Sequence, residues 1–392
     1  MKTTFKRAAA AVCAAVTITG MTACNTAPAD VQETQAPETS AASETAVTEG
    51  YTSSADYDKT VIRVDGNRFT VDGKTLFING VNTPWDKWND FGGAFNETFW
   101  EEHFAKLHES GVNASRIWIN CAGISTLKVD KDGILQSVSG KHWTDLDKLF
   151  ELAEKHHIYI MATLMSFDHF KDSNAGYENF RTMVSSEEGT QSYIDGYVIP
   201  FTQRYGKNPY LWSIDLCNEP DWIKENAECG KIDWDVLCTF FARCAAAIHD
   251  NSDELVTVGL GMIKYTSDKY DGNYFSDEYL GSLAGESAYL DYDCPHYYYW
   301  QFPYMGYPFE TTPAEFGLTH TKPAVIGEFA VLSESGRTCY EDYENAYNNG
   351  WNGLCMWTSN GVDGCGSIDD AGGATEHIAE IAHDEVFPLG DE

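Results

Sequence analysis

Eight short apolar runs, separated by stretches with helical periodicity, constrain the fold of this 392-residue chain more than any other feature. The runs are Phe77–Val81, Ala114–Ile119, Ile158–Leu164, Leu211–Leu216, Val256–Leu260, Tyr292–His296, Ala324–Gly327 and Gly353–Trp357. The helical stretches are Thr98–Ser110, Thr144–His156, Gln191–Tyr205, Trp234–Asn251, Glu278–Leu283 and Cys339–Asn349, followed by Ala374–Asp384. Buried strands that alternate with amphipathic helices indicate a parallel sheet covered by helices. Eight such strands predict a single (β/α)8 TIM barrel.

A doubly wound open sheet is the alternative to a barrel, but the sequence has no Gly-rich phosphate loop after the first run. Ahead of that run, Val61–Val64 and Arg68–Val71 alternate apolar and polar residues around the turn Asp65-Gly66-Asn67. This pattern predicts a short N-terminal β-hairpin. We expect the hairpin to close the bottom of the barrel.

The first 57 residues lack the pattern of a folded domain. Basic residues precede an apolar segment, Ala8–Gly20, that is too short to span a bilayer, and Met21-Thr22-Ala23-Cys24 follows it. This arrangement resembles a bacterial lipoprotein signal over residues 1–24, in which Cys24 becomes lipidated; ordinary secretion with cleavage near Ala23 is the alternative. Residues 25–57, rich in Ala, Thr, Glu and Pro, predict a disordered tether. We therefore expect an extracytoplasmic protein at the cell surface, anchored by lipid alone, with a folded domain over 58–392.

Charge and cysteine content limit the partners of the chain. Sixty acidic residues against 26 basic ones give a formal charge of −34. Such a surface repels nucleic acid and anionic membranes but not a neutral polysaccharide. Nine of the 11 cysteines follow Cys24, and no pair of CxxC motifs indicates a metal site. Several lie in apolar runs and are expected in the core, with one or two disulfides as an alternative; we expect a monomer.

Functional side chains of a TIM barrel come from the C-terminal ends of its strands. Those ends carry Arg116, Asn218, Glu219, His296, Tyr298, Glu328 and Trp357. Breaking an acetal requires one carboxylic acid to protonate the leaving oxygen and one carboxylate to attack the anomeric carbon. The two groups must hold opposite protonation states at one pH. We expect Arg116 and Tyr298 to keep Glu328 ionised, and Glu219, nearer His296, to keep its proton.

This ordered set resembles glycoside hydrolase family 5, within the larger clan A. The matching residues are Arg116 in the second strand, Asn218-Glu219-Pro220 after the fourth, His296-x-Tyr298 after the sixth, Gly327-Glu328 after the seventh and Trp357 after the eighth. The likeness spans about Val61 to Phe387. It implies a catalytic domain over 58–392, with Glu219 as acid/base, Glu328 as nucleophile and no cofactor or metal. The family also carries a His after the third strand, for which His169 is the nearest match.

Each candidate also has a simpler structural interpretation. Glu219 and Glu328 are two acids among 60 and could be exposed loop residues. Arg116 lies in an apolar strand, where a buried guanidinium needs an acidic partner, so a purely structural ion pair is an alternative. His296 and Trp357 could be core residues. The acids between 363 and 370 lack the spacing of a calcium loop and are expected in a solvated loop; His103, His108 and His142 are expected at the surface.

Aromatic residues are frequent in the loops that follow the predicted strands. They are Trp85, Trp88, Trp222, Trp300, Phe302 and Tyr304. Together with Trp357 they offer flat faces to sugar rings, and Asn218 offers an amide to a sugar 2-hydroxyl. Several platforms predict an extended groove and therefore an endo-acting hydrolase of a β-1,4-linked plant polysaccharide, with β-mannan slightly preferred over β-glucan. The alternatives are an endo-β-1,4-glucanase, an exo-acting β-glycosidase or transglycosylase, and a non-catalytic glycan-binding barrel.

Overall fold

The computed structural model describes residues 50–270, 272–319 and 321–390. The predicted signal with Cys24, and residues 25–49 of the predicted tether, lie outside the described residues. The end of that tether is described: Tyr51 donates from its backbone N–H to Asp147 Oδ1 at 3.1 Å and from its hydroxyl to Glu154 Oε2 at 2.8 Å. Tyr51 therefore already contacts the folded domain, ahead of the expected start at Asp58.

Eight parallel strands form the barrel that the apolar runs predict. In chain order they are β4 (Ile78–Asn82), β5 (Ala114–Trp118), β8 (Tyr159–Thr163), β9 (Leu211–Asn218), β10 (Leu255–Leu260), β13 (Cys294–Pro295), β14 (Val325–Ala330) and β15 (Gly353–Trp357). Each strand pairs with the next, except that β13 meets β14 only through single backbone bridges, Asp293–Ala324 and His296–Glu328; β15 returns to pair with β4. The TIM barrel is confirmed, and the open doubly wound sheet is wrong. Most strands are buried along their whole length, which explains their continuous apolar sequences.

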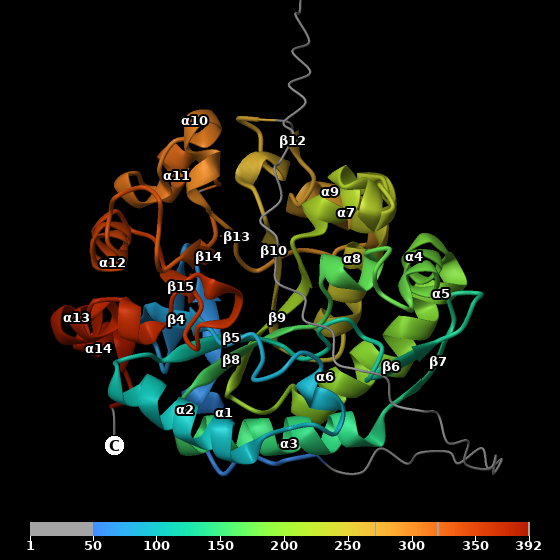
Figure 1. Ribbon diagram of the computed structural model, residues 1–392, viewed down its shortest axis with the longest axis horizontal. Helices are drawn as coiled ribbons and strands as arrows, with labels where there is room; N and C mark the ends of the chain where they lie inside the picture. Colours follow the sequence, from blue (N-terminus) through green and yellow to red (C-terminus); the bar gives the residue numbers. More distant parts are fainter. Residues whose placement is uncertain (1–49, 271, 320, 391–392) are drawn as a thin grey trace, which may run out of the picture. The chain divides into compact units, whose positions relative to one another are not determined.

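Helices surround the strands, with α12, α13 and α14 at the left of Figure 1 and α4 and α5 at the right. The larger helices are α2 (Glu97–Glu109), α3 (Gly140–Lys155), α4 (Tyr177–Ser185), α5 (Glu187–Tyr193), α6 (Ile199–Tyr205), α8 (Trp234–His249), α9 (Asp277–Ala284), α12 (Cys339–Asn348) and α13 (Ala374–Ile381). Shorter ones are α1 (Tyr57–Thr60), α7 (Pro220–Glu225), α10 (Phe302–Met305), α11 (Pro313–Phe316) and α14 (His383–Val386). A π-helical turn, Ile194–Val198, joins α5 to α6, so the helix predicted over Gln191–Tyr205 is continuous but not regular. No helix in the described ranges is both long and apolar enough to cross a bilayer.

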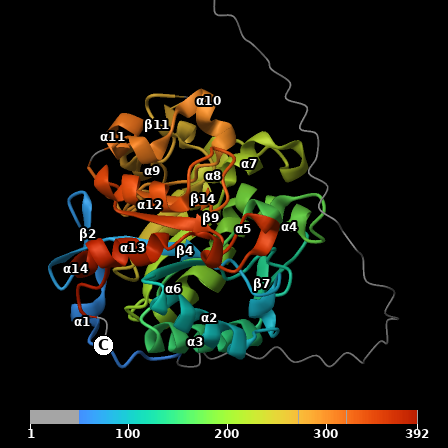
Figure 2. The same ribbon diagram turned by 60° about the vertical axis from the view of Figure 1, so that its left-hand side comes forward.

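A small antiparallel sheet closes the N-terminal end of the barrel. The predicted hairpin forms β1 (Ile62–Asp65) and β2 (Arg68–Val71), and β3 (Lys74–Leu76) adds a third strand. Phe69 on β2 is fully buried, with its ring centroid 5.4 Å from that of Trp212 and 5.2 Å from that of Tyr292. In Figure 2, β2 lies close to α14, and Lys74 Nζ donates to the carbonyl of Pro388 at 2.6 Å. The opposite end of the barrel is therefore the end that carries the functional loops.

All nine cysteines within the described residues are free thiols, and eight of them are buried. Cys217 and Cys355 lie in β9 and β15, and Cys238 lies in α8. These residues serve as small core side chains, as predicted. The alternative of one or two disulfides is wrong.

Candidate active site

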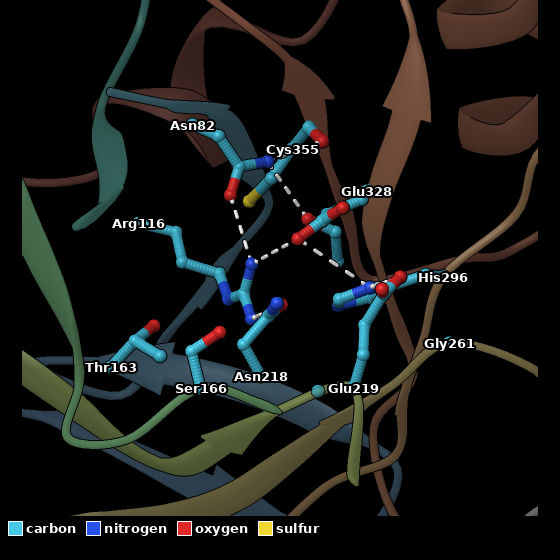
Figure 3. Close-up of polar contacts among 12 residues, drawn as sticks. Asn82, Arg116, Thr163, Ser166, Asn218, Glu219, Gly261, His296, Glu328 and Cys355 are labelled. Atoms are coloured by element: carbon cyan, nitrogen blue, oxygen red, sulfur yellow. Dashed lines mark hydrogen bonds and ion pairs between the residues drawn. The ribbon is translucent and has the colours of Figure 1, made fainter. Parts of the chain in front are cut away.

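Glu219 and Glu328 lie close together beside His296 (Figure 3), at the seam of the barrel, where single bridges join β13 to β14. Glu219 follows the last residue of β9, and Glu328 lies in β14. The bridge between His296 and Glu328, with the N–H of Tyr297 donating to the carbonyl of Glu328 at 2.8 Å, brings the residue after β13 beside β14. One carboxylate oxygen of each glutamate and a ring nitrogen of His296 all lie within 4.8 Å of one another.

Arg116 in β5 uses its five guanidinium N–H groups inside the barrel. Its Nε and Nη2 donate to Asp215 Oδ2 at 3.0 and 2.7 Å, and Nη2 also donates to Asn218 Oδ1 at 2.8 Å. Its Nη1 donates to Asn82 Oδ1 at 3.1 Å and to Glu328 Oε1 at 2.6 Å. Arg116 thus has two acidic partners: Asp215 balances its charge inside the barrel, and Glu328 connects it to the cleft. The structural and the functional interpretations of Arg116 therefore both apply.

Glu328 is held by two direct donors. Arg116 Nη1 contacts Oε1, and the Tyr298 hydroxyl donates to Oε2 at 2.7 Å. Burial raises the pKa of the Glu328 carboxyl above its usual value, as does the charge of Glu219, against the opposing effects of His296, Arg116 and Tyr298. The guanidinium pairs with Glu328, whereas the donors to Glu219 are uncharged. Glu328 is therefore the one of the two carboxyls that carries the negative charge.

Glu219 has different surroundings. Its oxygens contact His296 Nδ1 at 3.0 Å and the indole Nε1–H of Trp222 at 2.9 Å. Burial raises the pKa of Glu219 to about 7, against the smaller opposing effects of Arg116 and Trp222. Burial also lowers the pKa of His296 to about 4, so its ring is neutral at neutral pH. Glu219 consequently keeps its proton up to about neutral pH, which a general acid requires.

The carboxyl pair opens into a cleft of about 470 Å³. Its lining residues are Trp85, Trp88, Trp118, Phe167, Asp168, Lys171, Asn218, Glu219, Trp222, Gly261, Met262, Tyr298, Trp300, Glu328, Trp357 and Asp363. Trp88 and Trp300 are the most exposed of the tryptophans, at 42% and 51%. Trp357 lines the cleft and also packs against Trp118, with ring centroids 5.0 Å apart, so it is both a core residue and a cleft residue.

His169 does not belong to this cleft among the described residues. It lies in a 3-10 helix, Phe167–Phe170, where its Nδ1 hydrogen-bonds to the backbone of Ser166 and its ring packs against Phe180 at 4.9 Å between centroids. The loop turns its neighbour Asp168 toward the cleft instead. His169 therefore lies outside the cleft lining, and its role in substrate binding stays a prediction.

Several site residues were missed by sequence reasoning. Asp215 and Asn82 hold Arg116, and Asp168 and Lys171 form an ion pair of 2.7 Å in the cleft. The need of a buried Arg116 for an acid was the signal that pointed to a residue such as Asp215. Asp168 and Lys171 carried no comparable signal in the sequence, because only the fold brings their loop beside Glu219 and Glu328.

Two histidines expected at the surface are buried. His142 is fully buried, with Nδ1 at 2.9 Å from the carbonyl of Phe91 and Nε2 at 2.9 Å from the hydroxyl of Tyr197. His103 contacts Ser359 Oγ at 2.8 Å. The prediction was wrong because both rings find polar partners that lie far away in the sequence.

Within the described part of the chain, the group of side chains placed to hold a metal ion is Glu219, His296 and Glu328. Arg116, 2.6 Å from Glu328, already supplies a positive charge at this site. Glu219 and Glu328 of this group are also suited to act as an acid and a nucleophile.

No family model matches the chain. The chain is similar to a mannan endo-1,4-beta-mannosidase of Cryptopygus antarcticus, 25% identical over 337 residues, covering 78% of this chain and 86% of that protein. It is also similar to a mannan endo-1,4-beta-mannosidase of Mytilus edulis, 26% identical over 329 residues, covering 77% and 88%. Among solved structures it resembles the beta-mannanase from blue mussel, Mytilus edulis, with a TM-score of 0.74 and 23% identity, covering 84% of this chain and 99% of that one. The structural likeness confirms that the chain has the fold of this group of barrels.

Proposed function

We propose that the chain is a retaining, endo-acting glycoside hydrolase of the family 5 type that cleaves β-1,4-linked mannan. The observation that carries the proposal is the carboxyl pair. Oxygens of Glu219 and Glu328 lie within 4.8 Å of each other. Retaining glycosidases hold their carboxyl groups about 5–5.5 Å apart, and inverting ones need about 6.5–9.5 Å to admit a water molecule.

The mechanism follows from the surroundings of each carboxyl. Glu328, ionised beside Arg116, attacks the anomeric carbon, while Glu219 gives its proton to the leaving oxygen. A glycosyl ester on Glu328 results, and Glu219, now a base, activates the water that hydrolyses it. Asn218 Oδ1 is engaged by Arg116 at 2.8 Å, so its amide N–H groups are available to the sugar 2-hydroxyl in the cleft.

The cleft supports internal cleavage of a polymer. Trp85, Trp88, Trp222 and Trp300 line it together with the carboxyl pair, and aromatic faces are suited to the C–H faces of successive sugar rings. The relatives described as mannan endo-1,4-beta-mannosidases favour β-mannan over β-glucan as the polymer. An endo-β-1,4-glucanase and an exo-acting β-glycosidase remain the alternatives that digestion of defined polymers distinguishes.

Digestion of defined polymers tests the proposal directly. We expect the protein to release new reducing ends from β-mannan, as a ladder of oligosaccharides, and little from carboxymethylcellulose. The reverse preference would identify a glucanase. Release of single sugars with a preference for aryl glycosides would identify an exo-acting enzyme, and binding to mannan without hydrolysis would identify a glycan-binding barrel.

The activity on an unactivated polymer should fall as the pH rises through about 7. Glu219 must be protonated to act as the acid, and burial raises its pKa to about 7, so the acid is lost above that pH. The pH dependence of kcat/KM measures this basic limb, while the acidic limb reports the ionisation of Glu328. A profile that stayed flat well above neutral pH would contradict the assignment of Glu219.

From the sequence, we also propose that Cys24 is lipidated and holds the domain at the bacterial cell surface. The short apolar segment 8–20 and the small residues before Cys24 support this. Replacing Cys24 with serine is expected to move the protein from the membrane fraction to the medium. Equal partitioning of both forms into the medium would indicate ordinary secretion instead.

A further inference from the structure

Asp221 is a buried carboxyl close to the catalytic pair that the mechanism above does not use. It lies in the first turn of α7, two residues after Glu219, and is fully buried. Its Oδ2 accepts a hydrogen bond from the backbone N–H of Gly261 at 2.6 Å, and its Oδ1 has no hydrogen-bond partner among the described residues. A buried carboxyl with an unpaired oxygen destabilises the fold. Its contact with Gly261 therefore calls for an explanation other than stability.

Gly261, which has no side chain of its own and is hydrogen-bonded to Asp221, packs directly against Glu219. It follows β10 and lines the cleft (Figure 3). A Cβ atom on Gly261 would lie 2.8 Å from Asp221 Oδ2 and 3.3 Å from both Cδ and Oε1 of Glu219. The backbone of Gly261 therefore forms one wall of the space that the Glu219 carboxyl occupies.

The same residue is held from a second side. Gln301, fully buried after β13, donates from Nε2 to the carbonyl of Gly261 at 2.8 Å. Asp221 and Gln301 thus tie three successive strand ends together at Gly261. Glu219 itself has left-handed backbone angles, with φ 48° and ψ 55°, a strained conformation that persists only where its surroundings hold it.

We propose that Asp221 is a positioning residue for the general acid: by holding Gly261 against Glu219, with Gln301 on the other side, it orients the Glu219 carboxyl toward the leaving oxygen. This inference rests on the proposed glycosidase function. Burial, and then repulsion from Glu219, raises the pKa of Asp221 well above its usual range. Asparagine is a matched replacement, because it is uncharged and keeps an acceptor oxygen for the backbone N–H of Gly261.

Dependence on the leaving group distinguishes this role from a structural one. A poor leaving group needs the proton of Glu219, whereas a dinitrophenolate leaves without it. Asp221→Ala is expected to lower kcat on β-1,4-mannan by about 100-fold, the cost of a displacement of roughly 1 Å. The burst of dinitrophenolate from an activated glycoside, which reports the first step alone, should stay near the wild-type rate, and Asp221→Asn should restore activity on the polymer.

Asp342→Ala is the matched control, because Asp342 is a buried carboxyl whose partners Tyr307 and Arg337 lie outside the cleft lining. It should leave the ratio of the two rates unchanged. Equal losses on both substrates in Asp221→Ala, or no loss on either, would overturn the proposal. If Asp221→Ala does not fold, Gln301→Leu is the second variant, with the same change of ratio expected. Failure of the wild-type protein to cleave either substrate would instead refute the glycosidase function, and the inference about Asp221 with it.

Discussion

Replacing Glu328 with alanine is expected to abolish turnover on every substrate, including aryl glycosides with good leaving groups. No other carboxylate lies where Arg116 and Tyr298 hold Glu328 among the residues described, so no group can form the glycosyl ester. Loss of a covalent nucleophile lowers kcat by about 10⁴-fold or more. Initial rates on mannan and on an aryl mannoside measure the effect.

The variant also removes one partner of the buried Arg116, so its fold must be checked separately. Asp215 still pairs with Arg116 at 2.7 Å, and near-UV circular dichroism, which reports the packing of aromatic side chains, is expected to match that of the wild-type protein. Glu254→Ala offers a matched control, because Glu254 is a buried glutamate, 2% exposed, outside the cleft lining. Appreciable activity of a folded Glu328→Ala variant would mean that the nucleophile is another group.

Replacing Glu219 with alanine is expected to have the second largest effect, and one that depends on the substrate. Turnover of an unactivated polymer should fall by about 10²–10⁴-fold, the usual contribution of a general acid. The first step on a substrate with a good leaving group should be spared, because Glu328 and its donors are intact. Azide, a nucleophile that needs no general base, is expected to enter the vacated space and restore turnover as a glycosyl azide.

The pH profile gives an independent readout of the same variant. The basic limb expected near pH 7, which we assign to Glu219, should be absent from the profile of Glu219→Ala. Wild-type activity of Glu219→Ala on mannan would show that another residue is the acid. Loss of activity on activated and unactivated substrates alike would point to a folding defect instead.

The strands could be predicted because their information is local. A strand that is buried on both faces is a continuous apolar run, and all eight runs became barrel strands. The sixth, predicted over Tyr292–His296, forms a regular strand only at Cys294–Pro295, since a proline cannot donate to the neighbouring strand. The positions of Glu219 and Glu328 could also be predicted from the sequence, because the strand order places them at strands four and seven.

What escaped prediction depends on partners that lie far away in the sequence. His169 lies just after the third strand, but its ring hydrogen-bonds to the backbone of Ser166 and does not line the cleft. The sequence predicts His142 at the surface of a helix, but the ring is buried and hydrogen-bonds to Phe91 and Tyr197. Periodicity carries no information about such contacts, which only the assembled barrel creates.

The seam of the barrel has a consequence for how the protein becomes active. The bridge from His296 to Glu328 is one of the two backbone links that close the ring between β13 and β14. Opening of this seam would separate Glu328 from Glu219 without breaking the pair of Arg116 with Asp215, which lies on the other strands. We therefore expect hydrolysis only from chains in which the ring is closed. Specific activity should report the fraction of such chains, whereas helix content measured by spectroscopy should not.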